Sequence, residues 1–255
     1  RKMISPLNKL LGTVEVDMCD QNFRGIDYKS VPACARTKYG KAFRNVTLDG
    51  NTIRSELEDR KLGAIENQKC IEDAAQTGNG LKASNAGALA IVMDAFKLLS
   101  HHTTSPSNDE KQDLQARWNV LTREFKEKCG SSISKMGKVV SMCDTSGSMT
   151  WEGGLPIRAA LTLSLLVAGL PGPFRNRFMT FESKPKWHTL PQGDPTKDEF
   201  WIQFKSASNA SSGGSTNFSA ALDLLLTALV SARVPQSECP DVLFIFSDMQ
   251  VDEAN

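Results

Sequence analysis

Short apolar runs alternate with longer amphipathic segments in the second half of the chain. Four runs of strand length, bounded by Gly, Ser or Pro, predict buried or edge strands: 138–143, 177–181, 186–190 and 242–247. Three segments have the length and apolar periodicity of helices: 157–170, 194–207 and 217–234. Strands that alternate with helices in this way predict an α/β fold, with a mostly parallel sheet covered by helices on both faces.

The first half of the chain has a helical pattern instead. Apolar residues spaced by three and four positions predict helices over 6–18, 33–44, a short stretch around Ile53 and Leu57, 84–100, and 111 to about 128. The most polar and turn-prone stretch is Thr-Thr-Ser-Pro-Ser-Asn-Asp-Glu, residues 103–110. We therefore expect the end of a helical domain over 1–62, a helical connecting region over 63–131 with a linker near 103–110, and the α/β domain over 132–255.

One loop carries the candidate chemistry. Asp144, Ser146 and Ser148 follow the first apolar run at a spacing that turns three oxygens to the same side of an extended loop. Hard oxygen donors suit Mg²⁺ or Mn²⁺. Two more oxygens stand in comparable places, because Thr216 precedes the last predicted helix and Asp248 ends the last apolar run. Ligands bind at the carboxyl ends of the strands in such sheets, so we expect these five side chains to form one metal site.

Asp-x-Ser-x-Ser, a distant Thr and an Asp at a strand end, in this order, resemble the metal-ion-dependent adhesion site (MIDAS) of von Willebrand factor A (vWA) domains. The resemblance covers roughly residues 132–252 and implies a Rossmann-like vWA domain. It implies that the motif's hydroxyls bind the ion directly and that its two carboxylates bind it directly or through water. An Asp or Glu carboxylate of a partner protein would complete the shell. A vWA domain would continue through two more strand–helix units, so we expect a truncated C-terminus.

Other segments resemble an uncharacterised intracellular family in which a helical domain precedes the vWA domain, an arrangement similar to Ro/TROVE ribonucleoproteins. The segments that carry this resemblance are Thr-Val-Glu-Val-Asp-Met-Cys, Ile-Asp-Tyr-Lys-Ser-Val-Pro, Pro-Phe-Arg-Asn-Arg-Phe-Met-Thr-Phe, Ser-Thr-Asn-Phe and Phe-Ser-Asp-Met-Gln. Val251 departs from the pattern, which has an aromatic residue there, and this concerns core packing and not the metal ligands. The resemblance implies a metal-dependent protein-binding module of an intracellular assembly, and it implies no substrate.

A second functional class, RNA binding, rests on the predicted helix 33–44. Its cations are Arg36, Lys38, Lys41 and Arg44. Two aromatic residues, Tyr39 and Phe43, lie among them, and such an arrangement can hold phosphates and stack on bases. The alternative is an ordinary amphipathic helix whose aromatic rings face the core.

An enzyme is not expected. We identify no His, Glu or Lys near the metal motif as a general base, which disfavours a metal-dependent hydrolase. Ser146 interrupts the Asp-Thr-Gly pattern of aspartic proteases, and no second copy of that pattern exists. No P-loop, Gly-x-Gly-x-x-Gly or His-Glu-x-x-His motif occurs. A plain Ser/Gly turn without a ligand is the remaining alternative.

Charge and cysteine content narrow the setting. The 30 Lys and Arg residues nearly balance the 29 Asp and Glu residues, so the whole chain does not require a nucleic acid partner. The 6 Cys include no Cys-x-x-Cys pair, and Cys143 lies within a predicted strand, which favours free thiols in a reducing compartment. With no apolar run near the ~20 residues that cross a bilayer and no signal peptide, we expect a cytoplasmic or nuclear protein without a membrane partner.

Overall fold

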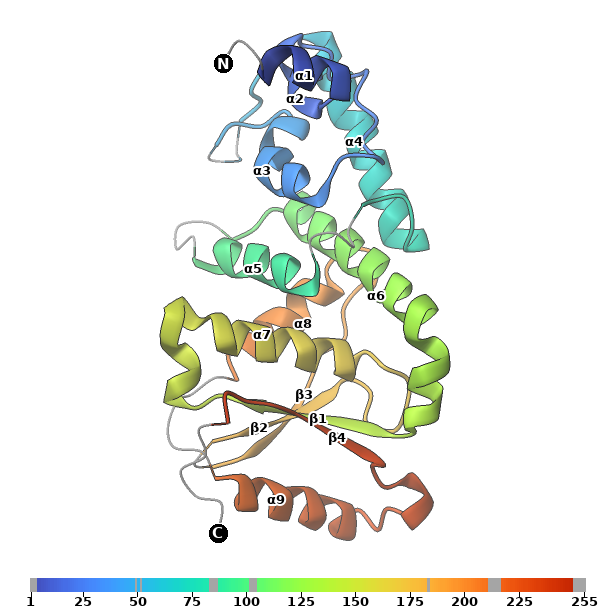
Figure 1. Ribbon diagram of the computed structural model, residues 1–255, viewed down its shortest axis with the longest axis vertical. Helices are drawn as coiled ribbons and strands as arrows, with labels where there is room; N and C mark the ends of the chain where they lie inside the picture. The colour runs from blue at the N-terminus through green and yellow to red at the C-terminus, as the bar shows by residue number, and fades with distance from the viewer. Residues whose placement is uncertain are drawn as a thin grey trace. The chain divides into compact units, whose positions relative to one another are not determined.

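In the computed structural model of the protein, helices occupy the chain as far as Met136, and a four-stranded sheet with further helices follows (Figure 1). The α/β prediction is therefore confirmed. The structure describes residues 4–48, 50, 52–82, 87–100, 105–182, 184–210 and 217–249. The chain divides into two units, of which the first comprises Arg1–Gly87, His102–Arg123 and Pro195–Asp198, and the second Ala88–His101, Glu124–Asp194 and Glu199–Asn255.

The first unit is helical. Its helices are α1 (Ile4–Leu11), α2 (Val14–Cys19), α3 (Ala33–Phe43), α4 (Glu58–Thr77) and the first part of α6 (Asn108–Met136). One cluster of buried residues gathers Phe23, Ile26, Tyr28, Val31, Ala35 and Phe43. A second cluster joins α4 to α6 through Ile71, Ala74, Ala75, Leu81, Ala116 and Val120. These two clusters are core clusters of the first unit, whereas Leu10 and Leu11 of the predicted helix 6–18 are 84 % and 65 % exposed.

Two helix predictions in this unit need correction. The stretch 6–18 is not one helix, because Gly12 adopts a left-handed backbone with φ +57° that separates α1 from α2. The stretch around Ile53 is not helical, since Ile53 pairs with Val46 in an isolated antiparallel bridge. The following helix, α4, begins only at Glu58 and runs as one helix across residue 62, where the sequence suggested a domain boundary.

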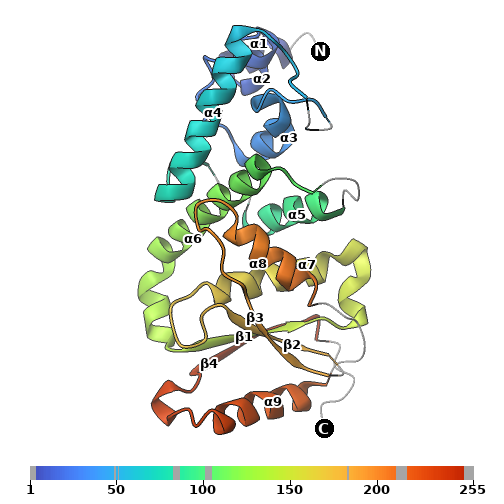
Figure 2. The ribbon, with the colours of Figure 1, turned by 180° about the vertical axis from the view of Figure 1, so that it is seen from behind.

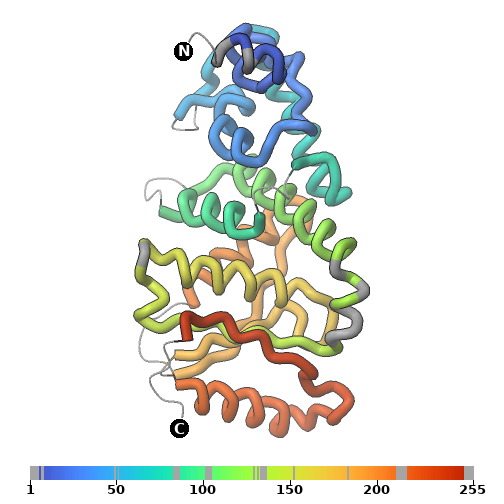
Figure 3. The backbone as a smooth tube through the Cα atoms, in the orientation of Figure 1, coloured from blue at the N-terminus to red at the C-terminus, as the bar shows by residue number. Residues whose placement is uncertain are grey.

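The second unit is built on a sheet with the order β3-β2-β1-β4. Its strands are β1 (Val139–Asp144), β2 (Arg177–Phe181), β3 (Lys186–Thr189) and β4 (Val242–Phe246). β1 pairs in parallel with both β2 and β4, and β3 pairs antiparallel with β2. All four strands lie where the apolar runs predicted them, and β3 is an edge strand of the described sheet, antiparallel to its neighbour β2. Figure 3 follows the backbone from β1 through α7 (Trp151–Ala168) to the neighbouring strand β2.

Helices cover both faces of this sheet (Figures 1 and 2). α7 and α8 (Glu199–Ser208) lie on one face, and α9 (Phe218–Ser231) lies on the other. Between α9 and the sheet, a buried cluster joins Val140, Met142, Met179, Phe181 and Ala221. α5 (Gly87–Ser100) belongs to the same unit and contacts α8 through an edge-to-face pair of Phe96 and Phe204 with 4.8 Å between ring centroids.

The boundaries of α7, α8 and α9 differ from the predicted ones by up to six residues, and α6, expected to end near residue 128, runs to Met136. α7 begins six residues before Ile157, and α8 begins five residues after Asp194. Asn217 caps α9 by accepting a hydrogen bond from the Ala220 N–H at 2.8 Å. No described helix is both long and apolar enough to cross a membrane.

Candidate metal centre

The carboxyl ends of β1, β2 and β4 meet at one edge of the sheet, because these three strands are parallel neighbours. In Figure 1 this edge lies at the left of the second unit, where α7 begins. The chain leaves β1 for β2 on one side and later returns to β4 on the other side. The point between β1 and β4 is therefore a topological switch point, which is where α/β sheets bind their ligands.

Asp144 ends β1 and is fully buried, with both carboxylate oxygens engaged. Its Oδ1 accepts the backbone N–H of Ser146 at 2.9 Å, and its Oδ2 accepts the hydroxyl of Ser247 at 2.5 Å. The Ser247 Oγ in turn accepts the backbone N–H of Met249 at 2.9 Å. One carboxylate thus connects the loop after β1 to the loop after β4, and these bonds fix its orientation.

The two serine hydroxyls of the motif lie side by side. Ser146 Oγ and Ser148 Oγ are 3.0 Å apart. Ser148 lies within the turn Gly147–Thr150, and Ser146 directly precedes this turn. This separation permits a hydrogen bond between them. It also equals the distance of about 2.9–3.0 Å between adjacent oxygens of an octahedral ion with metal–oxygen bonds of about 2.0–2.1 Å. Both hydroxyls can therefore bind one Mg²⁺ without moving apart.

Of the remaining two predicted ligands, Asp248 lies within the described residues and Thr216 does not. Asp248 lies two residues beyond β4 and is partly buried, at the same edge as Asp144. Thr216 lies outside the described residues, one position before the helix cap Asn217. Among the described residues, no group of three or more His, Cys, Asp or Glu side chains is arranged to hold a metal. The predicted site has only two such side chains, and its other donors are hydroxyls.

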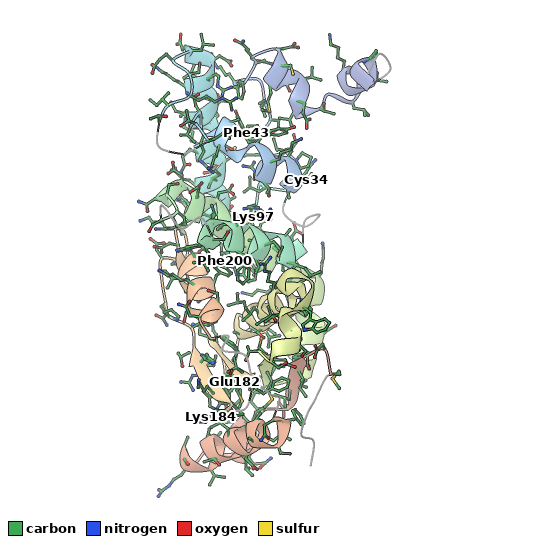
Figure 4. All side chains as sticks on the ribbon, turned by 90° about the vertical axis from the view of Figure 1, so that its left-hand side faces the viewer. Cys34, Phe43, Lys97, Glu182, Lys184 and Phe200 are labelled. Atoms are coloured by element: carbon green, nitrogen blue, oxygen red, sulfur yellow. The ribbon has the colours of Figure 1, made fainter. Side chains whose placement is uncertain are left out.

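Sequence reasoning missed Glu182, which follows β2 directly. Glu182 is 2 % exposed, and its carboxylate lies 3.5 Å from Thr145 Oγ1 and 3.5 Å from Lys186 Nζ. It lies near Lys184 in the loop after β2 (Figure 4). The signal that identified Asp144, a carboxylate at the end of an apolar run, was also present here. Each of the three parallel strands thus has an acidic residue at its last position or within the next two, and the expectation that no Glu stands near the motif is corrected.

Cys143 precedes the motif and is completely buried. Burial raises the pKa of its thiol to about 12. Because the thiolate is the reactive form, Cys143 acts as a small apolar group under the site. The five cysteines whose side chains are described are all free thiols: Cys19, Cys34, Cys70, Cys143 and Cys239.

The basic helix α3 presents fewer cations than the sequence suggested. Arg36 is only 3 % exposed, donates hydrogen bonds to Asn67 Oδ1 and the Tyr28 carbonyl, and lies 3.9 Å from Asp113. Arg117 contacts the same carboxylate at 3.1 Å. Burial lowers the pKa of the Arg36 guanidinium, and Asp113 opposes that shift. Arg36 is therefore part of the interior of the helical unit, which corrects the expectation that it contacts phosphates.

The other three predicted cations, Lys38 and Lys41 of α3 and Arg44 directly after it, differ in exposure. Arg44 pairs with Glu110 at 3.4 Å, with both side chains largely buried. Lys41 is partly buried and donates to the Leu48 carbonyl, while Lys38 is exposed, with its ammonium 4.8 Å from the centre of the Tyr39 ring. Of the two aromatic rings, Phe43 is buried in the core (Figure 4) and Tyr39 packs against it. α3 is thus an amphipathic helix whose aromatic rings face the core.

The fold and the site together define a helical region followed by an α/β domain with oxygen-rich loops at one sheet edge. Residues 138–255 match a family described as a domain of unknown function, DUF7788. The whole chain is similar to the uncharacterized protein L728 of Acanthamoeba polyphaga mimivirus, with 28 % identity over 256 residues. The chain spans 40 % of the length of that curated relative. No solved structure matches the chain.

Proposed function

We propose that the second unit is a protein-binding module that depends on a divalent cation, similar to the adhesion-type vWA domains. In this proposal Ser146, Ser148 and Thr216 bind Mg²⁺ or Mn²⁺ directly, while Asp144 and Asp248 bind it directly or through water. The observation that carries the proposal is the 3.0 Å separation of the two serine hydroxyls, which is the edge of a magnesium octahedron.

The site's own residues support this role in a specific way. Neutral hydroxyls supply the direct bonds, so the bound ion keeps most of its charge and attracts an Asp or Glu carboxylate from a partner protein. The Asp144 carboxylate is held by Ser146 N–H and the Ser247 hydroxyl, and its orientation is therefore set before any ligand arrives. Such preorganisation reduces the free-energy cost of binding.

The proposal concerns binding and not catalysis. Glu182, which sequence reasoning missed, lies close to Thr145 and Lys186. These two residues are hydrogen-bonding and charge partners for its carboxylate.

The five free thiols favour a reducing compartment, and we propose on that ground that the protein is cytoplasmic or nuclear.

RNA binding, as in Ro/TROVE ribonucleoproteins, is the weaker alternative. Of the four cations of α3, only Lys38 is exposed, Lys41 is partly buried, and the two arginines are engaged inside the helical unit. Two lysines neutralise few phosphates, and affinity for nucleic acid grows with the number of phosphates neutralised.

Calorimetric titration with Mg²⁺ tests the proposal. The wild-type chain is compared with a Ser146→Ala/Ser148→Ala double variant, which removes two ligands without burying a new charge, and with Ser231→Ala at the exposed end of α9 as the matched control. We expect binding heat from the wild type and the control only. Ca²⁺ should bind more weakly, because its longer bonds require oxygens farther apart. Equal heats from the wild type and the double variant would refute the proposal.

A further inference from the structure

Asn79 and Gly80 form an exposed Asn-Gly pair in the segment that follows α4. It is the one Asn-Gly pair in the sequence, and it lies outside regular secondary structure. Asparagine is a chemically labile residue, and a following glycine makes it more so, because glycine has no Cβ to hinder attack by its own backbone nitrogen. The pair is therefore a candidate site of chemical modification.

The local geometry leaves the reacting groups open. The Asn79 backbone N–H donates to Thr77 Oγ1 at 3.2 Å, but within the described part of the chain the Asn79 side chain and the Gly80 N–H make no hydrogen bond. Gly80 has a left-handed backbone with φ +88°, and a Cβ built there would meet no atom within 4 Å. The Gly80 nitrogen can therefore approach Asn79 Cγ by local rotation of the backbone.

Other asparagines of the helical unit are held by the fold. Asn45 is 5 % exposed, its Nδ2 donates to the Ser55 carbonyl at 2.8 Å, and its Oδ1 accepts from Arg60 Nε at 3.2 Å. The Asn119 side-chain amide donates to the Ala75 carbonyl at 2.7 Å. A valine follows each of these two asparagines, and its branched Cβ hinders the backbone nitrogen. Both asparagines should therefore keep their amides under conditions in which Asn79 does not.

The chain is anchored on both sides of the pair. The Thr77 carbonyl accepts a hydrogen bond from Arg123 Nη1 of α6 at 3.0 Å. Leu81 is 6 % exposed and belongs to the buried cluster that joins α4 to α6. Gly78, with φ +67°, ends α4 as a left-handed C-cap. Residues 78–80 thus span a short distance between two fixed points, and a lengthened backbone there displaces at least one of them.

We propose that Asn79 is a site of spontaneous deamidation, and that its isoaspartate product loosens the junction between α4 and α6. The Gly80 nitrogen loses its proton to hydroxide and attacks Asn79 Cγ. The new C–N bond closes a succinimide ring, and the Cγ–Nδ2 bond breaks as ammonia leaves. Water then opens the ring at either carbonyl and gives aspartate or isoaspartate. In isoaspartate the chain runs through the side-chain carbon, which adds one methylene to the backbone between Thr77 and Leu81.

Ageing of the intact chain at neutral and at mildly alkaline pH tests the chemistry, with peptide mapping by electron-transfer mass spectrometry. We expect aspartate and isoaspartate at position 79, forming faster at the higher pH because the attacking nitrogen must lose its proton, and intact amides at Asn45 and Asn119. The free peptide Thr-Gly-Asn-Gly-Leu-Lys is the reference. Native conversion should be within about tenfold of the peptide rate, an added barrier below about 1.4 kcal/mol. Conversion slower than that would overturn the proposal.

Hydrogen exchange of the last turn of α4 tests the consequence. We expect faster exchange in protein enriched in isoaspartate than in fresh protein, because local opening becomes less costly. Asn79→Asp adds the charge without the extra methylene and should exchange as the fresh protein does. Asn79→Gln, aged in the same way, should remain unchanged. Equal exchange in the fresh and the isoaspartate-containing protein would overturn the loosening, and equally fast exchange in Asn79→Asp would overturn its attribution to the lengthened backbone.

Discussion

The bond between Ser247 and Asp144 should carry a measurable share of the stability of the second unit. Asp144 is fully buried, and Ser247 Oγ is 2.5 Å from its Oδ2. A hydrogen bond to a charged group contributes about 1.5–3 kcal/mol. Ser247 itself is only partly buried, so water can replace part of the lost bond. We expect Ser247→Ala to lower the free energy of unfolding by about 2 kcal/mol in metal-free buffer.

Hydrogen exchange of the β1 amides, followed by mass spectrometry, measures this change within the second unit. A protein of two units need not unfold in one step, so a local measurement is preferable to a global melting curve. A loss of about 2 kcal/mol corresponds to exchange about thirtyfold faster where exchange follows unfolding. Ser231→Ala, which removes an exposed hydroxyl at the end of α9, is the matched control.

The same variant tests whether Ser247 positions the metal ligand. We expect Mg²⁺ affinity to fall roughly tenfold or more, because residues that orient a ligand affect metal binding at that scale. If the β1 amides of Ser247→Ala exchange no faster than those of the control, Asp144 is not held in the way described. The site would then not be preorganised, even if magnesium still bound.

Three further outcomes follow from the buried and paired groups. Arg36→Met should destabilise the helical unit by about 1–3 kcal/mol, since it leaves the buried Asn67 Oδ1 and the Tyr28 carbonyl without their donor while Arg117 still pairs with Asp113, and exposed Lys38→Met should not; circular dichroism melting compares them. Hydrogen bonds from the residue before β1 lower the pKa of Asp241, so this group stabilises the fold at neutral pH and loses that effect as pH falls through its lowered pKa. Asp241→Asn should therefore flatten the acid side of a stability–pH curve, and an unchanged slope would contradict the pairing. Iodoacetamide at pH 8 should modify exposed Cys34 but spare Cys143, whose pKa of about 12 and burial keep it a thiol; mass spectrometric labelling of Cys143 in the native protein would refute this.

The elements of the second unit follow from local patterns. The mostly apolar run Val139–Asp144 is buried at every position, as expected of a strand inside a sheet that is covered on both faces. Asp144 and Asp248 were identifiable because each stands where an apolar run ends and a polar loop begins. In the first unit, the same local reasoning was less successful, because one left-handed glycine, Gly12, interrupts a stripe that otherwise reads as one helix.

Only the tertiary structure decided which polar side chains are buried. Arg36 and Lys38 are two positions apart on one helix and look alike in the sequence, yet Arg36 is buried because Asp113, far along the chain, lies within 3.9 Å. Glu182 joined the candidate metal centre because β2 pairs in parallel beside β1. Ser247 became a partner of Asp144 because β4 pairs on the other side. The sequence determines where polar groups end the strands, and strand pairing determines which of these groups meet, since pairing depends on residues that are distant in the chain.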